Sequence, residues 1–370
     1  MVRFDNGPCN ATETETGICY THEQCDEKGG IQTQSCAAGF GVCCLFRGSC
    51  YDRVAEAKTY FSNPSWPLAD TSNSFCTYSL VVSDPDVCQI RLDFELFEMA
   101  PPSLTHSPIG ECDGDRLAIF TSQQNLGLYQ GNTVCGNLTG QHMYIPVNAT
   151  AAEDPVRLFA FVGQSGSSFR WNIKSSLIDC SKNNDLQAPD GCLQYFTEST
   201  GSIESLNYGS GAGSPYLAGT QYFACIKRQT GFCGVKIISS LGEFIMNSDL
   251  GTNIVPPGEG YNCASGDTVT GNNDYISALG SWSMNNTIRV PDTFYCGGTA
   301  TTTFPEINIG GGPLMLFIHT DDGVRYATGE LFEAATSLND TLLQENIINE
   351  RERGFRLTYT LQPCGYTSYP

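Results

Sequence analysis

The alternation of apolar and polar residues over Cys88–Phe97 gives the clearest predicted element of this chain. Ile90, Leu92, Phe94 and Leu96 occupy every second position of the segment. Because successive side chains of a β-strand point to opposite faces, this spacing predicts a strand with one buried face.

The same pattern occurs a second time further along the chain. A run with apolar Val235 and Ile237 begins at Cys233, as the first run begins at Cys88. Later, the alternating run Phe169-Arg-Trp-Asn-Ile173 leads to a cysteine at position 180, and the similar run Phe355-Arg-Leu-Thr-Tyr359 leads to one at position 364. These correspondences predict two copies of one β-domain.

Short β-rich runs separated by turn-forming residues fill most of the chain. With 39 glycines and 18 prolines there is little room for long helices, so the expected fold class is all-β, built from antiparallel sandwiches. Only residues 338–353, where leucine and isoleucine recur at helical spacing, offer an alternative. We interpret this segment as a surface insertion between two strands rather than a partner-binding helix.

Charge and cysteine content narrow the functional classes. The 370 residues include 39 acidic and 19 basic side chains, a net charge of -20, which disfavours nucleic acid and anionic membranes and favours a basic partner or a cation. Eighteen cysteines indicate an oxidising compartment, so we expect a secreted, extracellular protein. No apolar run is long enough to span a membrane. Residues 1–20 lack the apolar core of a signal peptide, so we expect the mature terminus near residue 1.

Five sequons agree with secretion, although a chain rich in Asn, Ser and Thr contains about that many by chance. The candidate N-glycan acceptors are Asn10, Asn137, Asn148, Asn285 and Asn339.

Residues 1–48 hold six cysteines and few large apolar side chains, so disulfides rather than a core must stabilise this segment. Six cysteines allow about 15 pairings, and spacing alone does not choose among them. The adjacent Cys43 and Cys44 do not easily bond to each other within normal disulfide geometry. Zinc binding is the alternative, disfavoured because no C-x-x-C pair occurs.

The cysteine segment resembles a short arthropod clip module. The resemblance rests on Gly17-Ile-Cys-Tyr, on Cys25 and on Gly39-Phe-Gly-Val-Cys-Cys44. The clip family pairs its first cysteine with the fifth, the second with the fourth and the third with the sixth. Carried over, this implies the disulfides Cys9–Cys43, Cys19–Cys36 and Cys25–Cys44.

The rest of the chain resembles two CUB domains, which are compact antiparallel β-sandwiches. The first copy has the turn Ser62-Asn-Pro-Ser-Trp-Pro67, then Cys112-Asp-Gly-Asp-Arg-Leu-Ala-Ile119 and Cys135-Gly. It departs from the family at that turn and in carrying Cys88 and Cys180. The second copy, which starts at Cys192-Leu-Gln-Tyr, is more divergent. The expected boundaries are a clip-like module at 1–48 and CUB domains at 49–181 and 182–370, an order similar to that of secreted arthropod CUB proteins.

The CUB resemblance implies four disulfides, and the extra cysteines must then pair with one another. The family pairs are Cys50–Cys76, Cys112–Cys135, Cys192–Cys225 and Cys263–Cys296. Because Cys88 and Cys233 open the central strands and Cys180 and Cys364 close the last ones, we also expect Cys88–Cys180 and Cys233–Cys364.

Calcium is the one ion that the resemblance suggests, because many CUB domains bind it through converging carboxylates. In the first copy Asp115 matches the motif, but Ala100 and Gln164 replace the other two acids, so no site is expected. In the second copy the candidates are Asp274 and Asp321, with Ile245 near the third acidic position. We otherwise expect no cofactor.

An enzyme is not expected. The four histidines form no metalloprotease motif, no G-x-S-x-G sequence occurs, and His319 beside Asp321 has no serine or cysteine nucleophile placed by it. Aromatic residues are candidate interface anchors, although most will be packing residues, and the chain ends are further docking candidates. The aromatic candidates are Trp66, Tyr216, Tyr222, Tyr366 and Tyr369, and the terminal segments are Met1–Asp5 and Gly365–Pro370.

The sequence therefore predicts a secreted, non-enzymatic protein that binds other extracellular proteins or copies of itself through CUB surfaces, in a structural or adhesive role. The alternative is a non-catalytic regulatory cofactor of an extracellular protease cascade in arthropod immunity or development.

Overall fold

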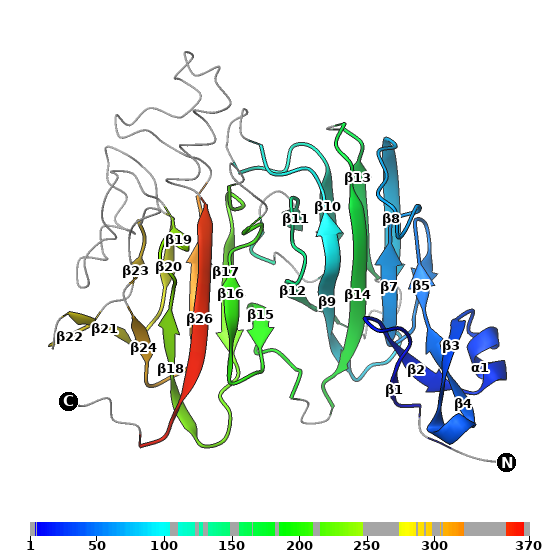
Figure 1. The fold of residues 1–370 in the computed structure, drawn as a ribbon, viewed down its shortest axis with the longest axis horizontal. Helices are drawn as coiled ribbons and strands as arrows, with labels where there is room; N and C mark the ends of the chain where they lie inside the picture. Colours follow the sequence, from blue (N-terminus) through cyan, green and yellow to red (C-terminus); the bar gives the residue numbers. More distant parts are fainter. Residues whose placement is uncertain are drawn as a thin grey trace.

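The computed structural model describes residues 4, 6–103, 110–122, 126–128, 132–148, 155–164, 166–181, 185–209, 215–246, 274–285, 288–291, 294–297, 304, 306–321 and 353–365. Nearly all of the regular structure in these residues is β-strand, as predicted. An amino-terminal module and two sandwiches lie in a row, with the module at one end (Figure 1). The predicted insertion at 338–353 lies outside the described residues except for Arg353. No helix in the described part of the chain has the length and apolar character needed to cross a membrane.

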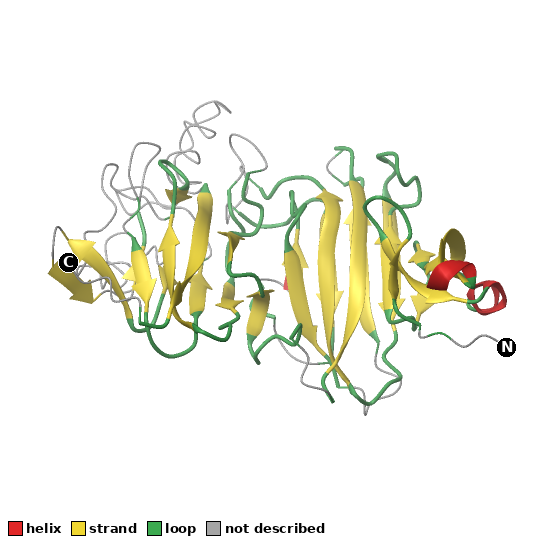
Figure 2. Cartoon of the chain, turned by 60° about the horizontal axis from the view of Figure 1, so that its bottom comes forward, coloured by secondary structure: helices red, strands yellow, loops and turns green. Residues whose placement is uncertain are grey.

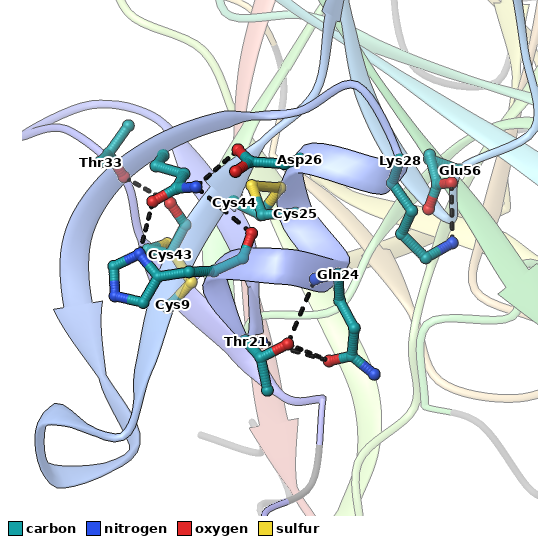
Figure 3. Close-up of a disulfide and its surroundings, with 12 residues drawn as sticks. Cys9, Thr21, Gln24, Cys25, Asp26, Lys28, Thr33, Cys43, Cys44 and Glu56 are labelled. Atoms are coloured by element: carbon teal, nitrogen blue, oxygen red, sulfur yellow. Dashed lines mark hydrogen bonds and ion pairs between the residues drawn. A yellow bond between two sulfur atoms is a disulfide. The ribbon is translucent and has the colours of Figure 1, made fainter.

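The amino-terminal module is a four-stranded antiparallel sheet with one short helix, which stands out at the end of the molecule in Figure 2. Its elements are β1 (Pro8–Asn10), β2 (Thr16–Tyr20), α1 (His22–Glu27), β3 (Ile31–Cys36), the 3₁₀ turn η1 (Ala37–Gly39) and β4 (Gly41–Leu45), with strand order β1-β2-β4-β3. Thr21 and Gln24 form a capping box that satisfies backbone donors at the start of α1 (Figure 3). Cys25 on α1 bonds to Cys44 on β4 and fixes the helix to the sheet.

The first sandwich consists of two five-stranded sheets. One contains β12 (His142–Pro146), β9 (Val87–Glu98), β14 (Arg170–Asp179), β7 (Lys58–Ser62) and β5 (Arg47–Gly48), in that order. The other contains β11 (Thr133–Val134), β10 (Arg116–Phe120), β13 (Val156–Val162), β8 (Ser74–Leu80) and β6 (Arg53–Val54). Because β5 pairs with β7, this sandwich includes the last two residues of the range assigned to the module.

Strand β9 departs from the predicted alternation at its end. Ile90, Leu92 and Phe94 are fully buried, as predicted, but the next fully buried apolar side chain is Phe97, and Leu96 is only half-buried. Opposite Asn172 and Ile173 of β14 the register skips one residue of β9, which is a β-bulge. A bulge leaves one residue out of the pairing and exchanges the two faces beyond it.

The second sandwich repeats the pairing pattern of the first. One sheet contains β22 (Ile288–Pro291), β21 (Ser281–Asn285), β24 (Ile307–Ile309), β18 (Phe232–Ile238), β26 (Gly354–Pro363) and β16 (Thr200–Glu204), with β19 (Phe244–Ile245) also on β26. The other contains β23 (Phe294–Tyr295), β20 (Tyr275–Ser277), β25 (Met315–His319), β17 (Gln221–Ile226) and β15 (Cys192–Phe196). The orders β24-β18-β26-β16 and β12-β9-β14-β7 correspond strand for strand, and the β21–β22 hairpin extends the second copy.

The two sandwiches share one continuous core. A single cluster of buried apolar residues runs from the first sandwich into the second. We call the contact between the two sandwiches the seam. There the Gln89 side-chain amide donates to the carbonyl oxygen of Ala188 at 2.8 Å and accepts from the N–H of Ala188 at 3.0 Å. The Nε2 atom of His142 accepts a hydrogen bond from the N–H of Tyr195 at 3.0 Å. These contacts fix the two sandwiches against each other.

The module is held on the first sandwich by a largely buried polar network. The Glu15 carboxylate forms an ion pair with Arg47 and accepts from Asn172 Nδ2 at 3.0 Å. Arg47 also donates to Ser62 Oγ at 2.7 Å, and the Tyr60 hydroxyl accepts from the N–H of Thr16 at 2.8 Å. Buried charges of this kind are tolerated when they are paired and hydrogen-bonded.

Candidate functional site

Disulfides stabilise all three parts of the chain. The structure contains Cys9–Cys43, Cys19–Cys36, Cys25–Cys44, Cys50–Cys76, Cys88–Cys180, Cys112–Cys135, Cys192–Cys225 and Cys233–Cys364, each of which is an expected pair. Cys296 is also disulfide-bonded, and its expected partner Cys263 lies outside the described residues.

The carboxylates considered for calcium lie at matching places in the two sandwiches. Asp115 is buried just before β10, and its Oδ1 accepts from the N–H of Gln164 at 2.8 Å. Asp274 is buried just before β20, and its Oδ1 accepts from the N–H of Asp321 at 2.5 Å. In each copy a buried aspartate therefore anchors the loop that follows a strand of the same sheet.

These residues fit calcium poorly. Calcium needs several converging oxygens with free lone pairs. Both carboxylate oxygens of Asp274 accept from protein donors, Oδ1 from the backbone of Asp321 and Oδ2 from the Tyr216 hydroxyl. Ile245, near the third acidic position, is fully buried and apolar. Among the described residues, no group of three or more His, Cys, Asp or Glu side chains converges on one point.

Burial lowers the pKa of two histidines. His142 is buried at the seam, and burial beside the Arg91 guanidinium lowers its pKa to about 4. His319 stacks on Tyr275 with ring centroids 4.8 Å apart, and burial lowers its pKa as well. Neutral rings packed in this way stabilise the fold.

Four phenylalanines gather on the outer face of the sheet that contains β8, β13 and β10. The ring centroid of Phe75 lies 5.0 Å from Phe161 and 5.5 Å from Phe159, and that of Phe120 lies 4.8 Å from Phe159. Phe75 is 42% exposed and Phe120 is 49% exposed. We call these four residues the aromatic face.

Two arginines border the aromatic face. Arg116 lies opposite Phe161 in the β10–β13 register, and its guanidinium carbon is 4.7 Å from that ring's centroid. Arg157 lies opposite Phe120 and is exposed. A protein with net charge -20 thus has a locally basic, aromatic surface here.

Of the aromatic candidates considered from sequence, Tyr216 and Tyr222 are not exposed anchors, because both are buried in the continuous core. In the same segment of the second sandwich, the backbone N–H groups of Ala218 and Gln221 donate to the carbonyl oxygens of Gly110 and Gly127 in the first sandwich. Trp66 is half-buried, with the Arg47 guanidinium carbon 5.7 Å from its ring centroid. Tyr366 and Tyr369 lie outside the described residues. Phe159 and Phe161 alternate with Leu158, Ala160 and Val162, which places both rings on one face of β13, but a run that is apolar throughout does not indicate which face is outward.

The other predicted sites occupy varied surroundings. Asn10 and Asn148 are exposed, and Asn137 is half-buried with its Oδ1 accepting from the N–H of Thr139 at 2.9 Å. The Asn285 side chain and Asn339 lie outside the described residues. Of the terminal segments only Phe4 and Gly365 are described, and the ring of Phe4 lies close to Gly41 of its own module.

One family model matches the second copy of the chain, and several solved structures resemble the chain at low identity. Residues 189–362 match the family model of the animal CUB domain. The CUB1-EGF-CUB2 domains of rat MASP-1 are 15% identical, covering 85% of this chain and 99% of that chain with a TM-score of 0.27. The same region of human MASP-1/3 is 16% identical and covers 83% of this chain and 100% of that chain, with a TM-score of 0.26. The full extracellular region of zebrafish Gpr126/Adgrg6 is 10% identical and covers 77% of this chain and 35% of that chain, with a TM-score of 0.26.

A search of curated proteins found no match. The matching family model lies on the second copy, the one that departs further from the family marks. CUB domains are non-catalytic modules that mediate protein–protein contacts in extracellular proteins. The family-model match therefore supports a CUB domain at residues 189–362, within a chain whose described fold is almost entirely β.

Proposed function

We propose that this protein is a secreted, non-catalytic binding protein that associates with other protein molecules through the aromatic face. The many disulfides support secretion, because such bonds persist in oxidising compartments. The match to a non-catalytic CUB domain supports a role in binding. The first-to-fifth, second-to-fourth and third-to-sixth pairing of its cysteines supports a clip-like module at the amino terminus.

The aromatic face is the observation that carries the proposal. Large rings in monomeric proteins are usually buried, and a cluster of exposed ones marks an interaction surface. Phe75 and Phe120 keep 42% and 49% of their surface in solvent although they lie in rigid strands. Burying such rings releases water at little cost in side-chain entropy, so they stabilise an interface.

The chemistry of the face favours a second copy of the chain as its partner. Arg116 and Arg157 make it locally basic, and an acidic protein surface complements it. The chain itself, with 39 acidic and 19 basic residues, supplies such a surface. We therefore assign this face to contact between copies of the protein.

Sedimentation velocity of the purified chain, up to about 100 μM, tests the assignment. We expect concentration-dependent association that weakens in Phe75→Ser/Phe120→Ser, because two anchors are lost. It should also weaken in high salt, which screens the arginines. Leu279→Ser is the matched control, since Leu279 is 72% exposed on the second sandwich. A chain that stays monomeric, or equal association of both variants, contradicts the proposal.

A further inference from the structure

A polar groove with one indole ring lies on the outer face of the second sandwich. It has a volume of 410 Å³ and is bordered by strands β18, β24, β21 and β26. In Figure 1 these strands lie at the end of the molecule away from the module. The groove is therefore separate from the aromatic face, which lies on the first sandwich.

Cross-strand pairing brings the groove's side chains together. Lys236 lies opposite Asn308, and Asn308 lies opposite Trp282. In the neighbouring row Gly234 lies opposite Gln362. Paired residues share a face of the sheet, so these side chains belong to the outer face, whereas Val235, between the two rows, is buried in the core.

Glycines form the floor of the groove. A Cβ atom on Gly234 would lie 2.7 Å from the carbonyl oxygen of Ile309, so no larger residue fits there. Gly310 is one of the residues that line the groove, and a Cβ atom on it would meet nothing within 4 Å. A side chain added at Gly310 would therefore meet no clash at the border of the groove.

The charged groups of the groove neutralise each other. Lys236 forms an ion pair with Glu306, and Asn308 Nδ2 donates to Glu306 Oε1 at 3.2 Å. An anionic ligand would have to compete with Glu306 for Lys236, so the site favours an uncharged ligand. The amides of Asn308 and Gln362 can both donate and accept, which suits a ligand that carries hydroxyl groups.

We propose that this groove binds a neutral saccharide of about two rings, a volume within the range of small-molecule sites. The apolar face of a pyranose stacks on the Trp282 indole, as amphipathic ligands do on aromatic side chains. Its hydroxyl groups bond to the Asn308 and Gln362 amides and to the Lys236–Glu306 pair. Because the pair and Asn308 are already bonded to one another, little ordering is needed on binding.

Titration of the full chain with N,N′-diacetylchitobiose, lactose and cellobiose tests the proposal, with saturation-transfer NMR as the readout. We expect at least one disaccharide to bind in the millimolar range and Trp282→Ala to weaken that binding by at least about tenfold. Tryptophan fluorescence gives a second readout in the unmodified chain. Trp66→Phe, which changes a tryptophan of the first sandwich, should keep the affinity.

Two glycine variants separate a lost site from a misfolded domain. Gly310→Val fills the groove and should abolish binding, whereas Gly311→Val should not. Gly311 also has nothing within 4 Å of an added Cβ, but it does not line the groove. No response to any of the three disaccharides at about 20 mM, or unchanged binding by Trp282→Ala and Gly310→Val, overturns the proposal. Phe75→Ser/Phe120→Ser should bind sugar normally, so the two proposals fail independently.

Discussion

The buried side chain of His142 makes the stability of the seam depend on pH. Its ring is 7% exposed, its Nε2 accepts from the N–H of Tyr195, and Arg91 and Asp93 lie near it. Burial and the Arg91 charge lower its pKa from 6.5 to about 4, so the folded protein holds it neutral. Protonation would remove the acceptor for Tyr195 and place a charge in the seam.

Acidification should therefore destabilise the seam through His142. The unfolded chain takes up the proton near pH 6.5 and the folded chain only near pH 4, so the stabilisation is present above pH 6.5 and is lost as pH falls toward 4. Between pH 7 and 4.5 we expect the free energy of unfolding to fall by about 2 kcal/mol through His142. The variant His142→Gln should not show this fall. Urea unfolding of both proteins at the two pH values measures it. The same pH dependence in both would refute the assignment.

The hydrogen bonds of Asp274 lead to a prediction about calcium binding. Its carboxylate already accepts from the Tyr216 hydroxyl and the Asp321 N–H, and Ile245, near the third acidic position of the sequence motif, has no carboxylate. We therefore expect isothermal titration with Ca²⁺ to show no tight stoichiometric site. One-to-one binding that disappears in Asp321→Asn would show that this loop binds the ion after all.

Strand β9 illustrates how far the elements could be predicted. The alternation of Ile90, Leu92 and Phe94 identified the strand and its buried face, because one-sided burial imposes a period of two. The bulge that brings Phe97 inward was not predictable, since it depends on pairing with β14, far away in the sequence. A two-residue period contains no information about the partner's register.

The aromatic face and the groove could not be predicted from the sequence. Tyr216 and Tyr222 lie in a turn-rich segment and are candidates for exposed anchors by sequence, yet both are buried in the continuous core. The aromatic face requires β8, β10 and β13 to lie side by side, and the groove requires Trp282 on the β21–β22 hairpin to lie next to Asn308. Both are long-range arrangements, visible only once the sheet order is known.

The ninth disulfide is a prediction about Cys263. Eight pairs are described and Cys296 is bonded, so we expect the ninth bond to be Cys263–Cys296, the pair that the CUB resemblance implies. Peptide mapping without reduction should recover one fragment that contains both cysteines. A Cys263 thiol that reacts with an alkylating reagent in the folded protein would contradict this pairing.

The module and the two sandwiches behave as one unit in this fold. A continuous apolar cluster joins the sandwiches, and the Glu15–Arg47 ion pair ties the module to the first of them. Under the proposed self-association, these contacts hold the aromatic face in place, which would reduce the entropy lost when copies associate. The net charge of -20 opposes random contact between copies, and Arg116 and Arg157 would offset that repulsion at the aromatic face.

Photo-crosslinking from the aromatic face tests whether copies of the chain meet there. A benzoyl-phenylalanine placed at Phe120, which is 49% exposed, reports the molecule that covers this ring. With purified protein at about 100 μM, irradiation should give covalent dimers from this position and none from the same probe at Leu279. Dimers from Leu279 with none from Phe120, or no dimers from either position, would contradict self-association through the aromatic face.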